Sequence, residues 1–407
     1  MNSTTLNSPD QTVKKTVFAV LFAVSFGHFV NDLLQAVVPS VYPMIKQKFH
    51  LTFSQIGLIT LTYQLTASIL QPFIGVFTDK KPKPYSLILG MTFTLTGLLG
   101  AAFAASFIHI LIAVSLIGIG SSIFHPESSR VAHLAGGGRK GLAQSIFQLG
   151  GNAGSAIGPL LAALIVAPHG QAYISWFGII AALGILVLYR IGRWYQGHLQ
   201  EKAANKMAAA TARYHHLSHG RVIFSLVILL VLIFSKYFYL ASMTSYYTFY
   251  LISKFDVTLQ QSQIYLFAFL GSVAAGTLLG GALGDRFGRK YVIWISILGV
   301  APFTLLLPYV SLFWTVALSV AIGLIISSAF SAILVYATEL VPGKVGMIAG
   351  LFFGLAFGMG GLGSAVLGKL ADETSVEYVF KVCAYLPLIG ILTGFLPNIE
   401  KEQSGNG

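Results

Sequence analysis

The chain has 407 residues, of which 55% are hydrophobic and 9% are charged, and its formal net charge is +12. A soluble protein of this size with so few charged residues would lack a charged surface, so the composition excludes the ordinary soluble classes. In lipid, backbone polar groups are satisfied within helices or closed barrels. The apolar runs last roughly 20 to 30 residues without polar alternation, which is typical of helices and not of barrel strands. We therefore predict an all-α membrane protein.

Hydropathy predicts twelve membrane-spanning helices. In chain order they are 16–46, 52–78, 84–106, 108–134, 141–167, 171–194, 221–252, 260–284, 290–309, 312–340, 344–371 and 376–396. Twelve spans place both termini on one side of the membrane, which we predict to be cytoplasmic because most basic residues fall there. Those basic segments are 14–15, 80–83, 139–140, 190–221 and 286–290. Topology thus accounts for the net charge without a nucleic-acid partner.

The apolar pattern also predicts the domain organisation. We expect a cytoplasmic tail at 1–15, a six-helix bundle at 16–194, a cytoplasmic linker at 195–220, a second six-helix bundle at 221–396 and a tail at 397–407. Histidines at positions 215, 216 and 219 could bind a metal ion, but a solvated linker is the strongly favoured interpretation. The first apolar run is too long for a signal peptide and lacks a cleavage pattern, so we expect it to be retained. The single cysteine, Cys383, excludes an internal disulfide.

Three sequence patterns occur twice, at nearly the same separation of 206 residues. The first pair is Gly75-x3-Asp79-Lys80 with Gly281-x3-Asp285-Arg286, and the second is Ser121-Ser122-Ile123-Phe124 with Ser327-Ser328-Ala329-Phe330. The third is Gly150-Gly151-x2-Gly154-Ser155-Ala156 with Gly360-Gly361-x-Gly363-Ser364-Ala365. Independent matches at one period indicate duplication. We therefore predict two pseudo-symmetric bundles of six helices each.

The first of these patterns resembles the major facilitator superfamily, whose loop between helices 2 and 3 carries Gly-x3-Asp-Arg-x-Gly-Arg-Arg/Lys. The second copy matches it with Gly281, Asp285, Arg286, Gly288, Arg289 and Lys290, and the first copy keeps Gly75, Asp79, Lys80 and Lys83. The resemblance implies that these residues latch the halves together in an outward-facing state. Pro82 replaces the later glycine, which puts the strength of the first latch in question. A cation-rich turn set only by topology is the alternative.

Helix 5 carries Gly154, Gly158 and Pro159, similar to the antiporter motif of drug-exporting members of the superfamily. Close helix packing at glycines spaced by four explains the same residues equally well. Segments 118–130, 236–239 and 357–363 further resemble bacterial fosmidomycin-resistance transporters. That resemblance implies proton-driven export of a small phosphonate drug across a bacterial inner membrane. We also expect the protein to be a monomer.

Ionisable residues at membrane depth are few, and each is a functional candidate. On helix 1, His28, Asn31, Asp32 and Gln35 share one helical face, which we expect to line the cavity. Lys236 on helix 7 stands at nearly the repeat-equivalent position of Asp32. In such folds the site lies near the midplane between the repeats. We expect Asp32 and Lys236 to face each other and to pair when no substrate is bound.

Helix 4 adds His125, Glu127 and Arg130, with the last two spaced to pair along the helix. The functional interpretation is a proton-accepting carboxylate beside a guanidinium that binds an anionic substrate. A structural salt bridge is the alternative. Polar contacts to the substrate are predicted for Gln64, Gln148, Tyr239, Tyr246 and Tyr247.

These observations predict a proton-coupled antiporter that works by alternating access, with protons carried by Asp32, Glu127, His28 or His125. Proton-coupled uptake of a metabolite remains an alternative, since a fold does not set direction. An intramembrane metalloprotease would need a His-Glu-x-x-His motif, which the stretch 28–32 lacks. We expect no enzymatic activity, cofactor, metal ion or nucleic-acid partner; the expected partners are a small molecule, protons and the lipid bilayer.

Overall fold

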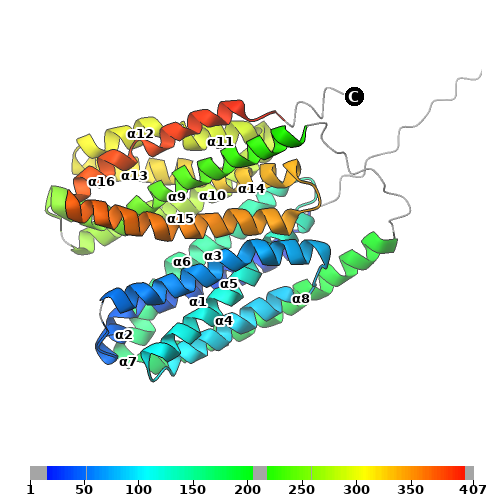
Figure 1. The fold of residues 1–407 in the computed structure, drawn as a ribbon, viewed down its shortest axis with the longest axis horizontal. Helices are drawn as coiled ribbons and strands as arrows, with labels where there is room; N and C mark the ends of the chain where they lie inside the picture. The colour runs from blue at the N-terminus through cyan, green and yellow to red at the C-terminus, as the bar shows by residue number, and fades with distance from the viewer. Residues whose placement is uncertain (1–15, 52, 205–217, 258, 399–407) are drawn as a thin grey trace, which may run out of the picture.

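The computed structural model describes residues 16–51, 53–204, 218–257 and 259–398, and every regular element in these ranges is helical. The helices run along the long axis of the molecule in two groups, with α1 to α8 in one and α9 to α16 in the other (Figure 1). The prediction of an all-α membrane protein is confirmed.

The first group corresponds to the first six predicted spans. Its elements are α1 (Phe18–Ser40), α2 (Tyr42–Lys48), α3 (Phe53–Lys80), α4 (Ser86–Ala102), α5 (Phe107–Ala135), α6 (Lys140–Leu161), η1 (Ala162–Val166), α7 (Ala167–His169), η2 (Gln171–Trp176) and α8 (Phe177–Ala204). The first predicted span is divided at Val41, because Pro43 starts a new helix in its first turn. In contrast, α5 continues through Pro126 as one helix.

The second group corresponds to the last six predicted spans. Its elements are α9 (His219–Phe255), α10 (Leu259–Phe287), α11 (Arg289–Ile297), α12 (Ala301–Leu306), η4 (Leu307–Tyr309), α13 (Leu312–Ser327), α14 (Ala329–Leu340), α15 (Val345–Glu373), α16 (Val376–Cys383) and η5 (Leu386–Phe395). Three of these last six predicted spans, 290–309, 312–340 and 376–396, therefore consist of two or more shorter pieces.

Nine of the described helical stretches are long and apolar enough to cross a membrane, and α4 is a shorter apolar helix. The remaining two of the twelve spans are α3 and α6, which are more polar. Both lie at the boundary between the groups, where α3 packs on α15 and α6 packs on α10. Helices that contact protein on several sides need less apolar surface than helices that face lipid.

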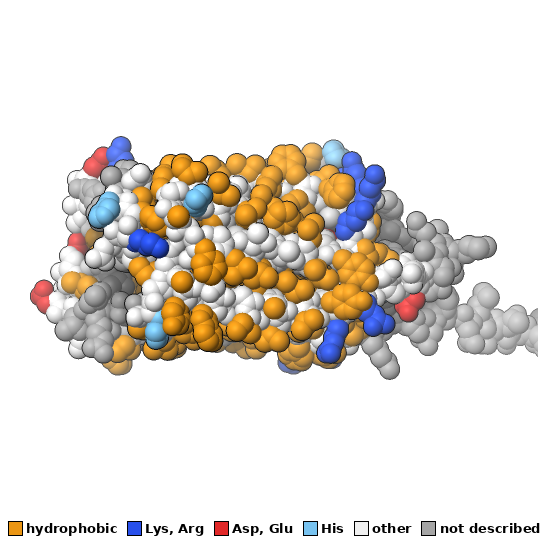
Figure 2. All heavy atoms as spheres, turned by 90° about the horizontal axis from the view of Figure 1, so that it is seen from below, with side chains coloured by type: hydrophobic (Ala, Val, Ile, Leu, Met, Phe, Trp, Pro, Cys, Tyr) orange, Lys and Arg blue, Asp and Glu red, His pale blue; other side chains and the backbone are white. Residues whose placement is uncertain are grey.

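Hydrophobic side chains cover the middle of the visible face, and most visible Lys and Arg side chains gather near one end (Figure 2). We call the end of the bundle at which α3 and α10 end the basic end; Lys80, Lys81, Lys83 and Arg286 lie in or just after the last turns of these helices, and Arg139 directly precedes α6, which begins beside Asp285. Phe73, Leu186 and Phe267 are 68%, 65% and 68% exposed, as expected for side chains that face lipid.

Candidate functional site

A carboxylate on α1 lies between two histidines. Oδ2 of Asp32 is 3.3 Å from Nε2 of His28, and Oδ1 is 3.3 Å from Nε2 of His125 on α5. Both histidine side chains are almost fully buried, whereas that of Asp32 is 13% exposed. We call these three residues the His-Asp-His cluster.

The other nitrogen of each ring determines the chemistry of the cluster. Nδ1 of His28 lies 2.8 Å from the carbonyl of Phe147, and Nδ1 of His125 lies 3.0 Å from the carbonyl of Ser121. A carbonyl oxygen only accepts, so Nδ1 of His28 carries the donated hydrogen, and a neutral His28 ring presents a lone pair at Nε2 to the carboxylate. Nδ1 of His125 also lies 3.2 Å from the hydroxyl of Ser121, which can donate to it, so a neutral His125 ring can present an N–H at Nε2 to Asp32. A proton on the His28 ring or on the carboxylate therefore favours the contact between His28 and Asp32.

The rest of the α1 polar face continues this network. Asn31 donates to Oδ1 of Asp32 at 3.1 Å, which supplies one permanent donor to the carboxylate. One turn further, the side-chain oxygen of Gln35 accepts from Tyr63 of α3 and from Ser121 of α5, the latter at 3.2 Å. The predicted stripe thus joins α1 to α3 and α5.

Glycines of α6 make room for the cluster. A Cβ on Gly151 would overlap the His28 ring and approach Oδ2 of Asp32 to 2.8 Å. Gly154 and Gly158 pack on the backbone of α1 at Phe29 and Leu33. This geometry favours the helix-packing explanation of these glycines. An antiporter role for them and for Pro159 stays a prediction.

Lys236 of α9 is 3% exposed and has few partners among the described residues. Its Nζ lies 3.4 Å from the carbonyl of Ser327, and 5.4 Å and 5.5 Å from the ring centroids of Tyr237 and Phe330. One long hydrogen bond and two ring faces compensate a buried ammonium only in part. An anionic ligand would complete its coordination.

Aromatic rings separate Lys236 from the His-Asp-His cluster. Phe353 of α15 lies 5.3 Å from His125, 6.1 Å from Phe147 and 5.0 Å from Phe330, centroid to centroid. Phe357 packs on His125 at 5.0 Å. We call Phe147, Phe330, Phe353 and Phe357 the aromatic layer. Phe353 of α15 thereby contacts both His125 of the cluster and Phe330, which lies next to Lys236.

The expected pair between Asp32 and Lys236 is not formed. Both residues are described, and neither contributes an ion pair or hydrogen bond to the other; Asp32 pairs with histidines, and Lys236 contacts Ser327. The physical reason is the aromatic layer, which occupies the space between the halves where such a pair would lie.

The other predicted substrate contacts lie in several places. Tyr239 and Tyr247 are buried in the hydrophobic core of the second group, with Tyr247 near Phe380. Gln148 is buried on α6, and its Oε1 has no hydrogen-bond partner among the described residues. Gln64 and Tyr246 are half-buried, next to Gly361 and Gly368 of α15. Their roles in substrate binding stay predictions.

At the basic end, the first latch joins the two groups through Asp79 of α3. Its carboxylate accepts from the backbone N–H groups of Gly346 and Met347, at 2.9 Å and 2.7 Å. These groups open α15, where the helix dipole favours a negative charge. Gly75 lies against the carbonyl of Gly346, so only a glycine fits there. The latch forms despite the departure of the first copy from the family pattern.

Arg130 supplies the cation of this first latch. Its NH2 lies 2.6 Å from Asp79, its NH1 lies 2.6 Å from the carbonyl of Thr78, and its guanidinium also pairs with Glu127 at 3.3 Å. Ser86 donates to the other oxygen of Glu127 at 2.8 Å. The structure thus engages Arg130 and Glu127 in the latch, and their substrate and proton roles stay predictions.

The second latch is the pseudo-symmetric counterpart. Asp285 of α10 accepts from the N–H groups of Gly141 and Leu142, at 3.0 Å and 2.8 Å, where α6 begins. Arg289 lies 3.4 Å from Asp285 and 3.2 Å from Glu339. Gly281 lies against the carbonyl of Gly141. Each half therefore inserts an aspartate into the start of a helix of the other half.

Several predicted latch residues lie outside these contacts. Lys80 and Lys83 are exposed, Arg286 lies over the ring of its neighbour Phe287, and Lys290 donates to the carbonyls of Gly394 and Leu396. Gly288 has φ +97°, a conformation that favours glycine and turns the chain between α10 and α11.

Some functional contacts were missed by the sequence reasoning. Asn152 of α6 donates to Thr277 of α10 at 3.0 Å and so connects the halves. Tyr63 and Phe353 were not singled out either. Tyr63 precedes the predicted Gln64, but aromatic residues are common in membrane helices, so periodicity offered no signal for them.

The ligand atoms of His28, Asp32 and His125 all lie within 4.8 Å of one another, close enough for one cation to be shared. Histidine and carboxylate also suit a metal ion, so the absence of a metal stays a prediction. Of the linker histidines, 215 and 216 lie outside the described residues.

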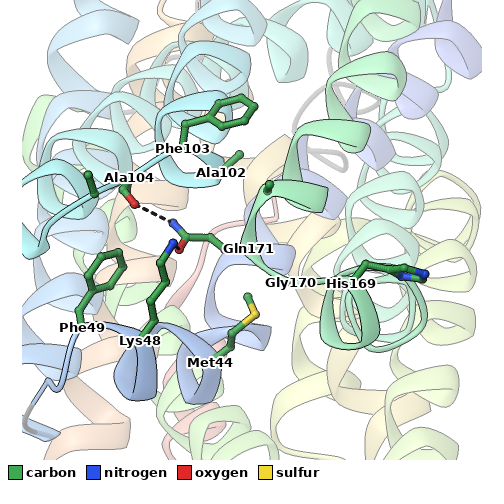
Figure 3. A pocket seen from close by; sticks show the side chains of 11 residues that line it. Met44, Lys48, Phe49, Ala102, Phe103, Ala104, His169, Gly170 and Gln171 are labelled. Atoms are coloured by element: carbon green, nitrogen blue, oxygen red, sulfur yellow. Dashed lines mark hydrogen bonds between the residues drawn. The ribbon is translucent and has the colours of Figure 1, made fainter.

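A separate pocket of about 750 Å³ is lined by residues of α2, of the segment after α4 and of the turn between α7 and η2 (Figure 3). Lys48 donates to Gln171 at 2.7 Å, and Gln171 donates to the carbonyl of Ala101 at 2.7 Å. These bonds tie α2 to the end of α4. No residue that lines this pocket belongs to the His-Asp-His cluster, so we assign it no part in transport.

The arrangement can be compared with known proteins. A family model described as Major Facilitator Superfamily matches residues 24–275 and 237–407. The chain is 58% identical to the fosmidomycin resistance protein of Escherichia coli, over 95% of each chain, and 43% identical to an uncharacterized MFS-type transporter of Bacillus subtilis, over 96% of this chain and 97% of that one. Its fold is similar to that of the transporter FucP in the outward conformation, with a TM-score of 0.70 and 17% identity over 93% of this chain and 98% of that one.

Proposed function

The chain belongs to the Major Facilitator Superfamily, and from this premise we propose that it exports a small anionic drug of the fosmidomycin-like phosphonate class in exchange for protons, by alternating access. The protein is a membrane transporter of twelve helices; the cargo, the direction and the proton coupling are the proposal. The likeness to a fosmidomycin resistance protein supports the cargo and the direction.

The His-Asp-His cluster carries the proposal of proton coupling. Nδ1 of His28 donates to the carbonyl of Phe147, so its Nε2 faces Oδ2 of Asp32 at 3.3 Å without a hydrogen unless the cluster binds an additional proton. The cluster is buried except for the partly exposed Asp32. A buried cluster whose contacts improve when it binds a proton is suited to pick up protons on one side of the membrane and release them on the other.

The latches support an outward-facing state for the protonated form. Both are closed at the basic end, which we take to be cytoplasmic because basic residues favour that side. With this orientation, the proposal puts both termini in the cytoplasm, and the bacterial relatives support a location in a bacterial inner membrane. Of the proposed linker 195–220, the part to Ala204 continues α8.

Lys236 is the proposed anion site. It is the buried cation of the second group that lacks a carboxylate partner among the described residues, in contrast to Arg130 and Arg289. Because the aromatic layer lies between Lys236 and the cluster, protons and drug need not compete for one atom. We propose that the cluster loses its protons in the inward-facing state and that the drug then binds at Lys236.

Everted vesicles from bacterial cells test this function. A gradient that is acidic inside should drive uptake of radiolabelled fosmidomycin, and a protonophore should abolish it. Asp32→Asn should lose gradient-driven uptake but retain exchange of labelled for unlabelled drug. The exposed His50→Gln variant is the matched control, and a chelator wash should change nothing. Uptake that Asp32→Asn leaves intact would refute the proton assignment, and accumulation of drug in intact cells that express the protein would indicate uptake instead of export.

A further inference from the structure

A groove of about 490 Å³ lies between α3 and α4 at the basic end. Phe77 and Leu89, both 53% exposed, form its outer walls, and Ile74 and Ile123 lie deeper. Its polar lining residues are Thr78, Lys83, Tyr85 and Ser86. No carboxylate belongs to the lining, so the groove combines an apolar channel with a positive mouth.

The side-chain ammonium of Lys83 at this mouth has no hydrogen bond or ion pair with another described residue, and Lys80 and Lys81 beside it are exposed. Its repeat-equivalent, Arg289, lies 206 positions later and pairs with Asp285 and Glu339. In the first half the corresponding partner of Asp79 is Arg130 instead. The change of latch cation therefore leaves Lys83 available for a ligand.

Tyr85 holds the rim of the groove in place. Its hydroxyl donates to Gln196 of α8 at 2.9 Å, and its ring stacks on Tyr189 with centroids 5.9 Å apart. Tyrosine is enriched at the membrane interface, where lipid headgroups lie. The hydrogen bond and the ring contact thus fix the rim, and its tyrosine suits the surroundings of a headgroup.

We propose that this groove binds one anionic phospholipid, with an acyl chain in the apolar channel and the phosphate at Lys83. Basic pockets between membrane helices are suited to anionic headgroups, and a basic residue near the surface contributes about 1 kcal/mol to such attraction. The apolar lining suits a hydrocarbon chain, and the positive charge selects against a zwitterionic lipid.

The position of the groove links this lipid to the first latch. Two of its lining residues are latch partners: Thr78 accepts from Arg130 through its carbonyl at 2.6 Å and its hydroxyl at 2.9 Å, and Ser86 donates to Glu127 at 2.8 Å. An acyl chain that fills the groove keeps α3 and α4 in the spacing that these bonds need. The bound lipid therefore favours the closed latch.

Native mass spectrometry of the delipidated full-length protein tests this site without any transport assay, so its result is independent of the proposed function. With equal amounts of phosphatidylglycerol and phosphatidylcholine, the wild type should retain one phosphatidylglycerol preferentially. Lys83→Gln should weaken that binding about five-fold, the effect of about 1 kcal/mol. Leu89→Trp, which fills the groove from a lipid-exposed position, should weaken both lipids.

Lys369→Gln is the matched control, because Lys369 is exposed and pairs only with Glu373 one turn away, outside the groove. It should bind as the wild type does. Equal retention of the two lipids by the wild type, or unchanged selectivity in Lys83→Gln, would overturn the proposal, since only non-specific surface lipid would then be present.

Discussion

Nε2 of His125 lies 3.3 Å from Oδ1 of Asp32, across 93 positions of the sequence and between two different helices. Nδ1 of the same ring lies near both the carbonyl and the hydroxyl of Ser121, at 3.0 Å and 3.2 Å. The Ser121 hydroxyl can donate to Nδ1 while Nε2–H is donated to Asp32. The state of the carboxylate on α1 thus depends on a donor from α5, as the proposed coupling to protons needs.

Replacing His125 by glutamine tests that dependence. A glutamine amide can donate permanently to Asp32, so the cluster should behave as if it were always protonated. We expect drug export driven by a pH gradient to fall by about tenfold or more, because a charge-assisted hydrogen bond is worth about 1.5–3 kcal/mol. The measurement is uptake by everted vesicles over a range of pH. His109→Gln, at an exposed position of α5, is the control, and a variant with the wild-type pH profile would contradict the prediction.

Lys236→Met should separate binding from folding. Methionine has a similar shape and removes a buried charge whose compensation is only partial, so thermal stability should rise or stay unchanged. Binding of fosmidomycin should weaken by about 2 kcal/mol or more, roughly 30-fold, because the variant lacks the ammonium group that binds the anionic drug in our proposal. Calorimetry on purified protein measures binding, and a melting curve measures stability. Unchanged affinity would exclude Lys236 from the anion site.

Gly151→Ala should disturb the His-Asp-His cluster. The added Cβ would overlap the His28 ring, and overpacking of this kind costs about 1–3 kcal/mol. We expect lower thermal stability together with loss of gradient-driven transport. The repeat-equivalent Gly361→Ala is the control, since its nearest neighbour would be Gln64 Cγ at 3.8 Å, an ordinary contact. Equal effects in both variants would show that the cluster is not the sensitive part.

Asp285→Asn should open the second latch more often. The carboxylate accepts two backbone N–H bonds from α6, and an amide can replace them only in part. Alkylation of a cysteine at Ser145, which is fully buried beside Gly281, reports this opening. The native Cys383 is buried and should stay unlabelled. We expect labelling about tenfold faster or more, from the loss of about 1.5–3 kcal/mol.

The control for the latch is Asp256→Asn, at an exposed position of the opposite end with φ +52°, where asparagine is tolerated. Its labelling rate should equal that of the parent. A latch variant that labels no faster than this control would show that Asp285 does not hold the basic end closed.

Phe353→Leu should uncouple protons from drug. Leucine keeps the site apolar but loses the ring contacts with His125 and Phe330 that connect the cluster to the surroundings of Lys236. Proteoliposomes loaded with a pH-sensitive dye should show proton leakage without drug. Phe313→Leu, at a position that is 73% exposed, is the control. Leakage that still requires drug would show that coupling does not pass through Phe353.

The helices could be predicted well because lipid exposure imposes long apolar runs. The structure departs from the predicted helix boundaries mainly where a proline divides a span or where a helix continues beyond its apolar run. Pro43 divides the first span at Val41, and α8 continues to Ala204, ten residues beyond the predicted boundary. Hydropathy marks where a helix leaves the apolar part of the membrane. A polar helical segment satisfies its backbone hydrogen bonds internally just as an apolar one does, so a helix can continue beyond that point.

The candidate site was harder to predict. The face of His28, Asn31, Asp32 and Gln35 follows from helical spacing, because residues three and four apart lie on one side of a helix. The partner of Asp32 does not follow from it. The repeat suggested Lys236, whereas the structure provides His28 and His125.

The sequence by itself determined the membrane class, the number of spans, the repeat and the residues that carry charge in the membrane, since each follows from local composition or from a fixed period. Only the tertiary structure decided which charges meet: that Arg130 serves the latch, that an aromatic layer separates Asp32 from Lys236, and that the Lys83 side chain has no partner among the described residues. Contacts between distant segments depend on how helices pack around their small residues and rings, and that packing leaves no period in the chain.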